Sequence, residues 1–476
     1  MAKELRRRQG MPVDLTRKIL DCAYELQRQL FESGEVASEL LHSAVGALTE
    51  LATTLRVQGD TRAALEAAER ARDIASVLTA RAPHNARRQH DLAVSYERIG
   101  DIQMTDGRRE QALESYRMNL AIMEKLAAGD PGNVEWRRGL STSLRKIALA
   151  LEASGRAEEA LATVRNSLTI VEALIAVDPT DRSAQRDLSI THIGIGDLLV
   201  SMGRREDALD AYRRSIAIDE RLVAADASDT ASRRDLSISN DRIGNVQLAM
   251  GRAEDALASY RKSLAIRVRL AATDRGNTQW QNDVFQSLGF VGDVLVTLGR
   301  DAEALDIYRQ RLAIAEVLAS ADRGNVEWQR DLALSMSKLG NVLSRTGRRD
   351  EALTFYRQSL AMVERLASAD PGNTEWQRDL SVAYNKIGDV LEQAGRDEEA
   401  LAAYRADLVV SGKLVAANPN NTEWQRDLSI SYERSARFPS RPDGVPKRSM
   451  PIARRSRSAS GSPPPIRAMR SGRLIW

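Results

Sequence analysis

The sequence predicts an all-α protein, an α-solenoid of eight two-helix repeats with one further helix at the N-terminus. The 476-residue chain matches itself at a spacing of 48 residues without insertion or deletion. Each unit holds two stretches of apolar residues at helical spacing. A glycine ends the first stretch of every unit, as a left-handed residue after a helix requires. These glycines are Gly59, Gly107, Gly155, Gly203, Gly251, Gly299, Gly347 and Gly395.

The unit from residue 373 to residue 417 shows how the two helices are encoded. Its first half carries Leu380, Ile387 and Leu391 on one helical face, and its second half continues in the same way from Ala400. From Asn85 onward, every copy of the first helix is preceded by an asparagine or aspartate, such as Asn373. A short side-chain oxygen at this position accepts a hydrogen bond from the unpaired amides of the first turn. We therefore expect each first helix to begin directly after this residue.

One set of residues in this unit resembles a known family. The pattern Tyr384-x2-Ile387-Gly388-x2-Leu391, followed by Gly395, Ala400 and Tyr404, is similar to the tetratricopeptide repeat, in which W-x2-L-G-x2-Y precedes A-x3-F. The resemblance covers residues 39 to 422. It departs from the family in length, because the usual repeat has 34 residues and the extra residues here amount to about four helical turns. The resemblance implies a right-handed superhelix with extended helices, whose first helices line a concave groove.

The chain is expected to have three segments. Residues 1–38 hold a basic N-terminus and a helix from Pro12 to Phe31, which takes the place of a second helix of a repeat. We favour a cap of the solenoid for this helix, since terminal repeats are commonly atypical, over the remainder of a longer array or an upstream domain. Residues 39–434 form the repeat array. Residues 435–476 are rich in Ser, Pro and Arg, as is typical of a disordered basic arm.

A second interpretation of the tail is a ninth repeat translated in the wrong frame. One choice of codons for the expected sequence RLAAADPGNAEW, read one base late, gives GSPPPIRAMRSG, which is the sequence of residues 461–472. The hidden Asp-Pro and Trp then fall where the 48-residue period places them. The frame would slip just after Arg434. The coding DNA tests this hypothesis, because restoring the frame there must yield a ninth repeat.

Charge and composition exclude several classes of function. The net charge is +3, but residues 437–476 contribute ten basic residues and one acidic residue, so the rest carries 59 minus 65, or −6. The array therefore lacks the basic excess that favours a nucleic-acid partner. Cys22 is the only cysteine, and neither a secretory signal nor an apolar run near the length of a membrane span is recognised. We expect a cytoplasmic protein with no membrane segment.

No pattern for catalysis, cofactor binding or metal binding is found in the sequence. The four histidines form no His-x3-His pair and no cluster with cysteine. Gly194-Ile195-Gly196 lies inside a helix and not between a strand and a helix, so it does not predict a dinucleotide loop. The acidic residues recur at repeat spacing, where a pair for acid–base catalysis is not distinguishable. We predict that the protein is not an enzyme and holds no cofactor.

Several columns, meaning residues at equivalent positions of successive repeats, are expected to serve the fold. The tryptophan column that includes Trp328 and the tyrosine column that includes Tyr356 supply large rings for packing. Two arginine columns follow the glycine and the tyrosine, and an aspartate column includes Asp187 and Asp331. Because both signs repeat with one period, we expect ion-paired or solvated faces at these columns.

The candidate partner-binding residues lie in the first helices. The column after the small residue faces the groove in the resembling family, and here it is acidic and amide-rich, which favours a basic partner. A structural hydrogen-bonding role is the alternative for this column. Further candidates come from the disturbed fourth and sixth repeats, and from the position of a lysine that some family members use to bind C-terminal carboxylates. The candidates are Asp101, His192, Asp197, Asn245, Phe290, Asp293, Asn341, Asn385 and Asp389.

The sequence therefore predicts a non-catalytic scaffold that binds a protein or peptide along its concave groove. The alternative is a regulatory or sensor arm of a larger signalling protein or ATPase, whose effector domain is missing or encoded separately. A third hypothesis, nucleic-acid scaffolding, requires an affinity that falls steeply with salt and survives removal of the tail.

Overall fold

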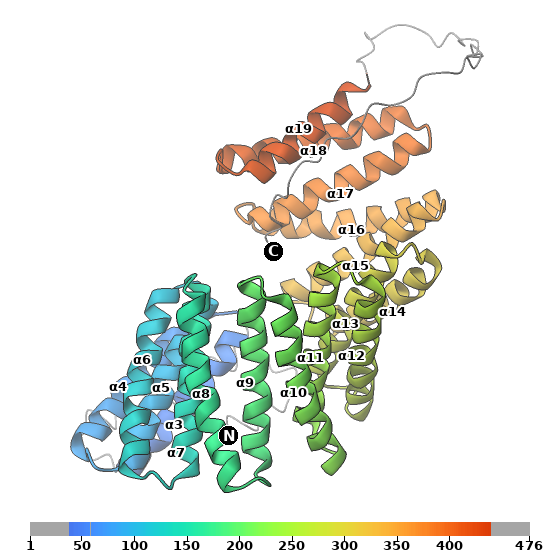
Figure 1. The fold of residues 1–476 in the computed structure, drawn as a ribbon. Coiled ribbons are helices and arrows are strands. Elements are labelled where there is room, and N and C mark those ends of the chain that lie inside the picture. Colours follow the sequence, from blue (N-terminus) through green and yellow to red (C-terminus); the bar gives the residue numbers. More distant parts are fainter. Residues whose placement is uncertain (1–37, 58, 439–476) are drawn as a thin grey trace, which may run out of the picture.

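The computed structural model describes residues 38–57 and 59–438, and within them the chain forms a stack of α-helices without strands (Figure 1). The helix predicted from Pro12 to Phe31 and the segment from residue 439 onward lie outside the described residues. The proposed frame slip after Arg434 falls near the end of the last helix and stays a hypothesis that the coding DNA tests. The last helix ends at Ala436, slightly beyond the predicted end of the array at Arg434.

The helices follow one another in pairs and form eight repeats, which confirms the predicted all-α solenoid. Every first helix has 20 residues and every second helix has 21. The first helices are α3 (Ser38–Val57), α5 (Ala86–Thr105), α7 (Val134–Ala153), α9 (Arg182–Ser201), α11 (Thr230–Ala249), α13 (Thr278–Thr297), α15 (Val326–Arg345) and α17 (Thr374–Gln393). The second helices are α4 (Thr61–Arg81), α6 (Arg109–Gly129), α8 (Ala157–Val177), α10 (Arg205–Ala225), α12 (Ala253–Thr273), α14 (Asp301–Ala321), α16 (Arg349–Ala369) and α18 (Asp397–Ala417). Helix α19 (Thr422–Ala436) follows in the place of a ninth first helix.

The helix ends coincide with the residues that predicted them. Asn325 Oδ1 accepts a hydrogen bond from the amide of Trp328 at 3.1 Å, and Asn85 caps α5 in the same way. The glycine between the two helices of each repeat has a φ between +69° and +84°. This left-handed conformation is strained for other residues, so glycine ends each first helix.

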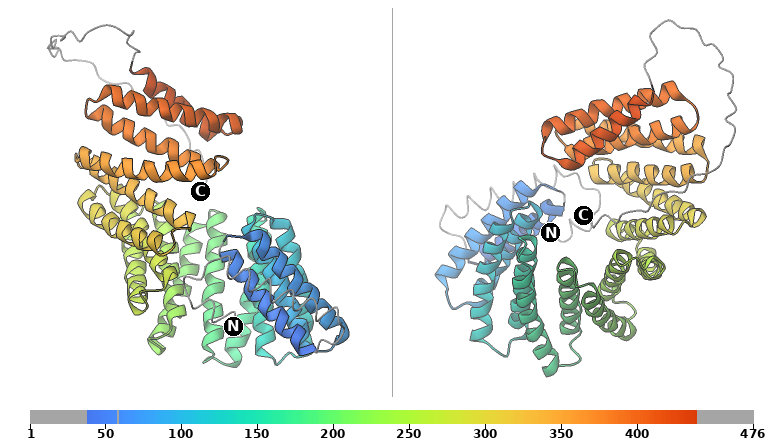
Figure 2. Two further views of the ribbon diagram at one scale, coloured as in Figure 1. Left: turned by 180° about the vertical axis from the view of Figure 1, so that it is seen from behind. Right: turned by 45° about the horizontal axis from the view of Figure 1, so that its top comes forward.

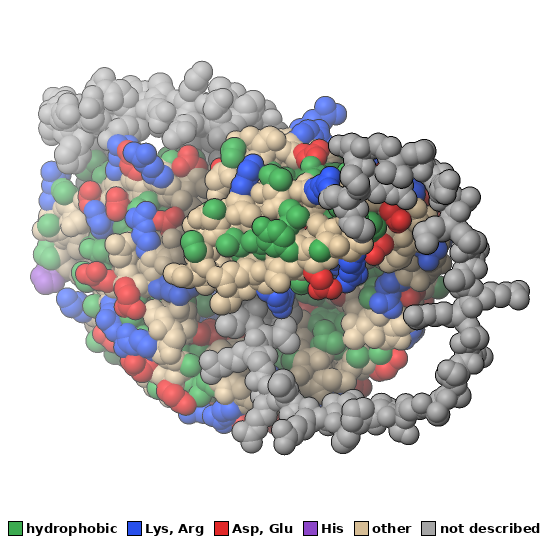
Figure 3. Space-filling view, turned by 90° about the horizontal axis from the view of Figure 1, so that it is seen from above, with side chains coloured by type: hydrophobic (Ala, Val, Ile, Leu, Met, Phe, Trp, Pro, Cys, Tyr) green, Lys and Arg blue, Asp and Glu red, His purple; other side chains and the backbone are tan. Residues whose placement is uncertain are grey.

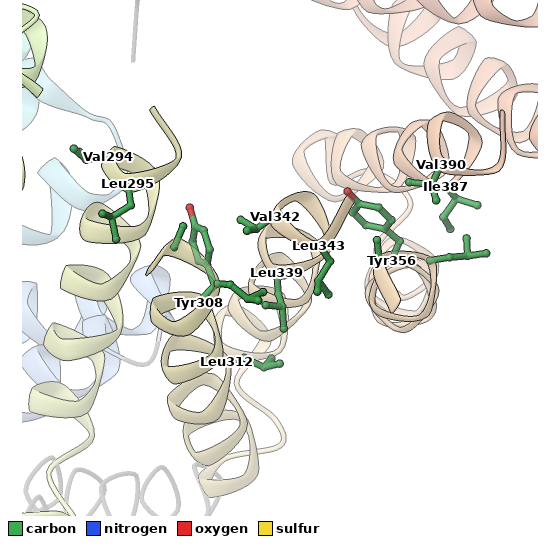
Figure 4. Packing of buried hydrophobic residues seen from close by; sticks show 14 of the residues in the cluster. Val294, Leu295, Tyr308, Leu312, Leu339, Val342, Leu343, Tyr356, Ile387 and Val390 are labelled. Atoms are coloured by element: carbon green, nitrogen blue, oxygen red, sulfur yellow. The ribbon is translucent and has the colours of Figure 1, made fainter. Parts of the chain in front are cut away.

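The interior is apolar in two long stretches. One cluster of buried residues runs from Ala256 in α12 to Tyr404 in α18. Figure 4 shows part of it, with Tyr308 and Tyr356 pointing between neighbouring helices toward aliphatic side chains. A second cluster runs from Ala112 in α6 to Val246 in α11. Burial of these side chains stabilises the stack in proportion to the apolar area removed from water.

The two long clusters are separate at the fifth repeat, where α11 and α12 are joined by a buried ion pair. Arg267 contacts Asp241 at 2.7 Å, and both side chains are only 8% exposed. The interior of the fifth repeat therefore contains a buried charged pair in addition to apolar side chains.

The stack bends toward its first helices. The first helices of neighbouring repeats touch in the pairs α3 with α5, α7 with α9 and α9 with α11. Among the described residues, second helices of neighbouring repeats make no contact of the same extent. The resulting curve is visible in Figures 1 and 2. We call the surface formed by the first helices the concave face and the surface formed by the second helices the convex face.

Helix α8 differs from the sequence-based expectation about membrane spans. By length and composition it is apolar enough to cross a membrane, with a mean hydropathy of 1.5 in its most apolar window. In the structure it is the second helix of the third repeat and packs against α7 and α9. Its residues Leu161, Val164 and Val171 are buried in this packing.

Candidate partner-binding face

The acidic and amide column that was predicted to face a partner is hydrogen-bonded inside six of the eight repeats. The tyrosine of the second helix donates its hydroxyl hydrogen to this residue of the first helix. Tyr212 donates to Asp197 Oδ1 at 2.6 Å, and Tyr260 donates to Asn245 Oδ1 at 2.6 Å. The same bond joins Tyr116 to Asp101, Tyr308 to Asp293, Tyr356 to Asn341 and Tyr404 to Asp389. This geometry supports the structural role that was the alternative for the column.

The small residue before this column makes room for the same tyrosine. A Cβ atom on any of the six glycines opposite a tyrosine would lie within 2.8 Å of the ring. The third repeat has Val164 in place of the tyrosine, and there the glycine is Ala148 and the hydrogen-bond acceptor is Leu149. The three positions change together, so they form one packing unit.

The carboxylates of the column are also paired with cations of the next repeat. Lys146 contacts Asp101 at 2.5 Å and Lys338 contacts Asp293 at 2.7 Å. Arg242 pairs with Asp197 at 3.0 Å, and Arg434 pairs with Asp389 at 3.2 Å. Burial raises the pKa of Asp197 and of Asp389, and the paired arginine opposes this shift. The column is therefore not an open acidic strip.

The remaining candidates lie in different environments. His192 is buried, with 7% of its surface exposed, and burial lowers its pKa. His192 was predicted to lie on the surface of the groove, and its buried position corrects this prediction. Phe290 is half-buried and stacks on Tyr260, with 5.2 Å between the ring centres. Asn385 donates to the carbonyl of Ser381 at 3.3 Å and accepts from Arg434.

The concave face also carries a stripe of aliphatic side chains that was not predicted from the sequence, and we call it the apolar stripe. Its members occupy one position of six first helices, on the same helical face as the acidic and amide column. They are half-buried or exposed, with Val382 43% exposed and Ile430 38% exposed. The apolar stripe consists of Val94, Ile190, Ile238, Leu334, Val382 and Ile430, and Thr142 and Gln286 take this position in the third and sixth repeats. In the sequence, the apolar stripe was visible as an aliphatic residue repeated at one position outside the helical face that forms the core.

A second missed feature links the first helices of neighbouring repeats, and we call it the arginine ladder. In each pair an arginine of one first helix contacts an aspartate of the next, one repeat and one residue later in the chain. The pairs are Arg138–Asp187 at 2.7 Å, Arg186–Asp235 at 2.6 Å, Arg234–Asp283 at 2.7 Å, Arg330–Asp379 at 2.6 Å and Arg378–Asp427 at 3.7 Å. His42 and Asp91 occupy equivalent positions at 2.7 Å. The arginine directly before most of these aspartates in the sequence was the available signal.

Asp219 is a buried carboxyl group that the sequence did not single out. It is fully buried in α10, receives a hydrogen bond from Ser215 at 3.5 Å, and its Oδ1 has no hydrogen-bond partner. Burial raises the pKa of Asp219 to about 7. The group lies inside the stack and away from any open surface, so it affects stability more directly than binding.

The described residues contain no group of three or more His, Cys, Asp or Glu side chains that could hold a metal ion. Figure 3 shows basic and acidic side chains interspersed on the visible face, without a large area of one sign. Several arginines after the glycines pair with an acidic residue three positions later, as in Arg348–Glu351, whereas Arg252 pairs with Glu206 of the preceding repeat. These arrangements are typical of solvated, ion-paired surfaces.

The stacked helix pairs and their concave face define an α-solenoid repeat protein. The model of the tetratricopeptide repeat family matches residues 332–371 in the seventh repeat, which confirms the resemblance drawn from the sequence. The 48-residue unit around that match recurs throughout the array.

Solved structures with a similar arrangement have low sequence identity to this chain. The apo form of RapI is 12% identical with a TM-score of 0.48, and the match covers 73% of this chain and 87% of RapI. The apo form of the quorum sensor NprR from B. thuringiensis is 15% identical with a TM-score of 0.45, covering 84% and 95%. A putative kinesin light chain from Podospora anserina is 16% identical with a TM-score of 0.37, covering 50% and 100%. A comparison with curated proteins gives no match.

Proposed function

We propose that this protein is a non-catalytic scaffold that binds a protein or peptide along its concave face. The apolar stripe carries the proposal. Six first helices place an aliphatic side chain at one equivalent, partly exposed position. Covering aliphatic surface releases water and is favourable, so such a surface suits a partner that contributes apolar side chains.

The surroundings of the apolar stripe support the same proposal. On one side the arginine ladder joins neighbouring first helices, and on the other the tyrosine bonds hold each first helix to the second helix of its own repeat. A surface that is ordered before binding loses less conformational entropy when a partner arrives. The carboxylates of the column are already paired, so they no longer support the expectation of a basic partner. The proposal therefore specifies apolar contact along the stripe. As part of it, we place the protein in the cytoplasm, where a chain with one cysteine needs no disulfide.

The test compares exposed aliphatic residues on the two faces. The full chain is immobilised and used to capture proteins from a lysate of its source. One variant carries Val382→Asp and Ile430→Asp on the concave face, and its control carries Val268→Asp and Val317→Asp on second helices. The native residues at all four positions are exposed, at 43%, 38%, 48% and 59%. We expect capture to fall roughly tenfold or more in the concave variant only, since desolvated anchors dominate binding.

Equal capture by the two variants, each with the circular-dichroism spectrum of the native chain, would contradict the proposal. Loss in the control variant alone would place the partner on the convex face.

A further inference from the structure

The arginine ladder is interrupted between α13 and α15. Asp331 stands at the ladder position of α15, but the residue that should supply its arginine is Asn282. Within the part of the chain that the structure describes, no hydrogen bond or ion pair reaches the carboxylate of Asp331, which is half-buried. The shorter asparagine side chain thus leaves an aspartate without the partner that its equivalents have.

The other interruption of the ladder differs from this one. Between α5 and α7 both partners are replaced, by His90 and Gly139, so no charged group is left over. His90 packs instead against Trp136, with 5.2 Å between the ring centres. Between α13 and α15 only the arginine is replaced and Asp331 remains. This change is therefore not the loss of a whole ion pair, as it is between α5 and α7.

Arg311 lies close to Asp331 but does not replace the missing arginine. It projects from α14 with its guanidinium carbon 4.1 Å from the centre of the Phe285 ring, in space left by Gly289. Its Nε is buried and has no hydrogen-bond partner. Burial raises the pKa of Asp331 and lowers the pKa of Arg311, and the opposite charge of each group works against the shift of the other. The described residues nevertheless show no ion pair between the two side chains.

The ladder itself shows that such an aspartate can take two arginines. Asp187 contacts the outer Arg138 at 2.7 Å and also lies 3.8 Å from the more buried Arg145. Gly289 stands at the position of Arg145 in the sixth repeat, and Arg311 from the second helix fills the space beside it. At Asp331 the chain supplies no arginine at the outer position on the concave face, which Arg138 occupies beside Asp187.

We propose that a partner supplies this arginine and binds its guanidinium to the carboxylate of Asp331, beside Asn282. The inference rests on the proposed scaffold function and names one contact within it. A planar guanidinium forms two parallel hydrogen bonds to a carboxylate, so arginine fits this place better than lysine. The sixth repeat also carries the exposed Gln286 where most other repeats carry an aliphatic residue. This polar point in the apolar stripe suits a polar side chain of the partner.

The experiment uses the full-length chain and a display library of random dodecapeptides. Four proteins are compared: the native chain, Asn282→Arg, Asp331→Asn and the control Gln310→Arg. Asn282→Arg fills the place with the chain's own arginine, as Arg186 and Arg234 do at other junctions, so it should fold normally. Gln310 is exposed on the second helix of the same repeat, and its replacement adds the same charge on the convex face.

The native chain should enrich peptides with one recurrent arginine. Fluorescence anisotropy should show that Asn282→Arg and Asp331→Asn each weaken the selected peptide by about tenfold or more, the range of a lost hydrogen-bonded charge pair. Gln310→Arg should leave its affinity unchanged. Exchange of the peptide arginine for citrulline should weaken binding to the native chain and cause no further loss with Asn282→Arg.

The other outcomes separate the two proposals. Enriched peptides without a recurrent arginine, or an equal effect of citrulline on the native chain and on Asn282→Arg, would overturn the arginine site and leave the scaffold function standing. If no peptide is enriched and no protein is captured in the lysate experiment, the scaffold function fails and the arginine site fails with it.

Discussion

The third and sixth repeats both depart from the common pattern, but only one of them balances its departures. In the third repeat Val164 replaces a tyrosine, and Ala148 and Leu149 replace the glycine and the hydrogen-bond acceptor that serve that tyrosine. In the sixth repeat Asn282 and Arg311 replace their column residues. The guanidinium of Arg311 and the carboxylate of Asp331 in the next repeat are then left without ion pairs among the described residues.

The difference separates changes that preserve the fold from changes that need another explanation. A balanced change removes both sides of an interaction and can be nearly neutral in stability, whereas a one-sided change leaves a polar group to be desolvated without its partner. A one-sided change that persists in an otherwise regular array is therefore a better indicator of a binding site than the shared columns.

The largest effect is expected from breaking the balanced unit. Gly340→Ala in the seventh repeat places a Cβ atom 2.7 Å from Cε1 of Tyr356, so the ring must shift within a packed core. We expect the free energy of unfolding to fall by about 2–3 kcal/mol, as is common for overpacked cores. Urea denaturation followed by circular dichroism measures the change.

The matched control copies the third repeat into the seventh. The triple variant Gly340→Ala, Asn341→Leu and Tyr356→Val removes the tyrosine, its hydrogen bond of 2.8 Å and the need for glycine together. It should recover much of the stability that Gly340→Ala alone loses. A triple variant less stable than the single variant would show that the three positions do not form one unit.

Asp219 is another buried polar group without a full set of partners, and its effect on stability depends on pH. The pKa of Asp219 is raised to about 7 in the folded chain, above about 3.8 when unfolded, so the folded state binds more protons between these values. Stability from this group is complete below the lower value and is lost as pH rises toward 7. We expect the native chain to lose about 2 kcal/mol relative to Asp219→Asn between pH 5 and pH 8.

Urea denaturation of both proteins across this pH range measures the difference. The neutral amide cannot ionise, so other titrating groups affect both proteins alike and cancel. Parallel pH profiles of the two proteins would show that Asp219 titrates normally in the folded state.

The fold was predictable because each helix boundary is repeated eight times in the sequence. The caps, the left-handed glycines and the two apolar faces all point to the same pairs of helices. The role of the acidic and amide column was not settled, because the tyrosine that binds Asp197 lies 15 residues away on another helix. Only packing of the two helices shows that this tyrosine reaches the carboxylate and that a cation of the next repeat pairs with it.

The ladder was missed for a related reason. The aspartate column was recognised, but its arginines lie one repeat and one residue earlier, and the relevant distance is across the concave face. The departure at Asn282 became visible only when the pairs on both sides of it were known. Sequence periodicity therefore predicts the shared architecture well, whereas the candidate site depends on contacts between repeats.

The smallest effect is expected where the ladder is completed. Asn282→Arg should give Asp331 the partner that Asp283 and Asp379 have, at 2.7 Å and 2.6 Å in their own pairs. Because these arginines remain partly exposed, the gain in the free energy of unfolding should be about 0.5 kcal/mol. The gain should vanish when Asp331→Asn is added, and a double-mutant cycle in urea isolates it from changes in net charge. A loss of stability that persists in the double variant would mean that the concave face at Asn282 has no room for a guanidinium, and the one-sided departure of the sixth repeat would then need a different cause.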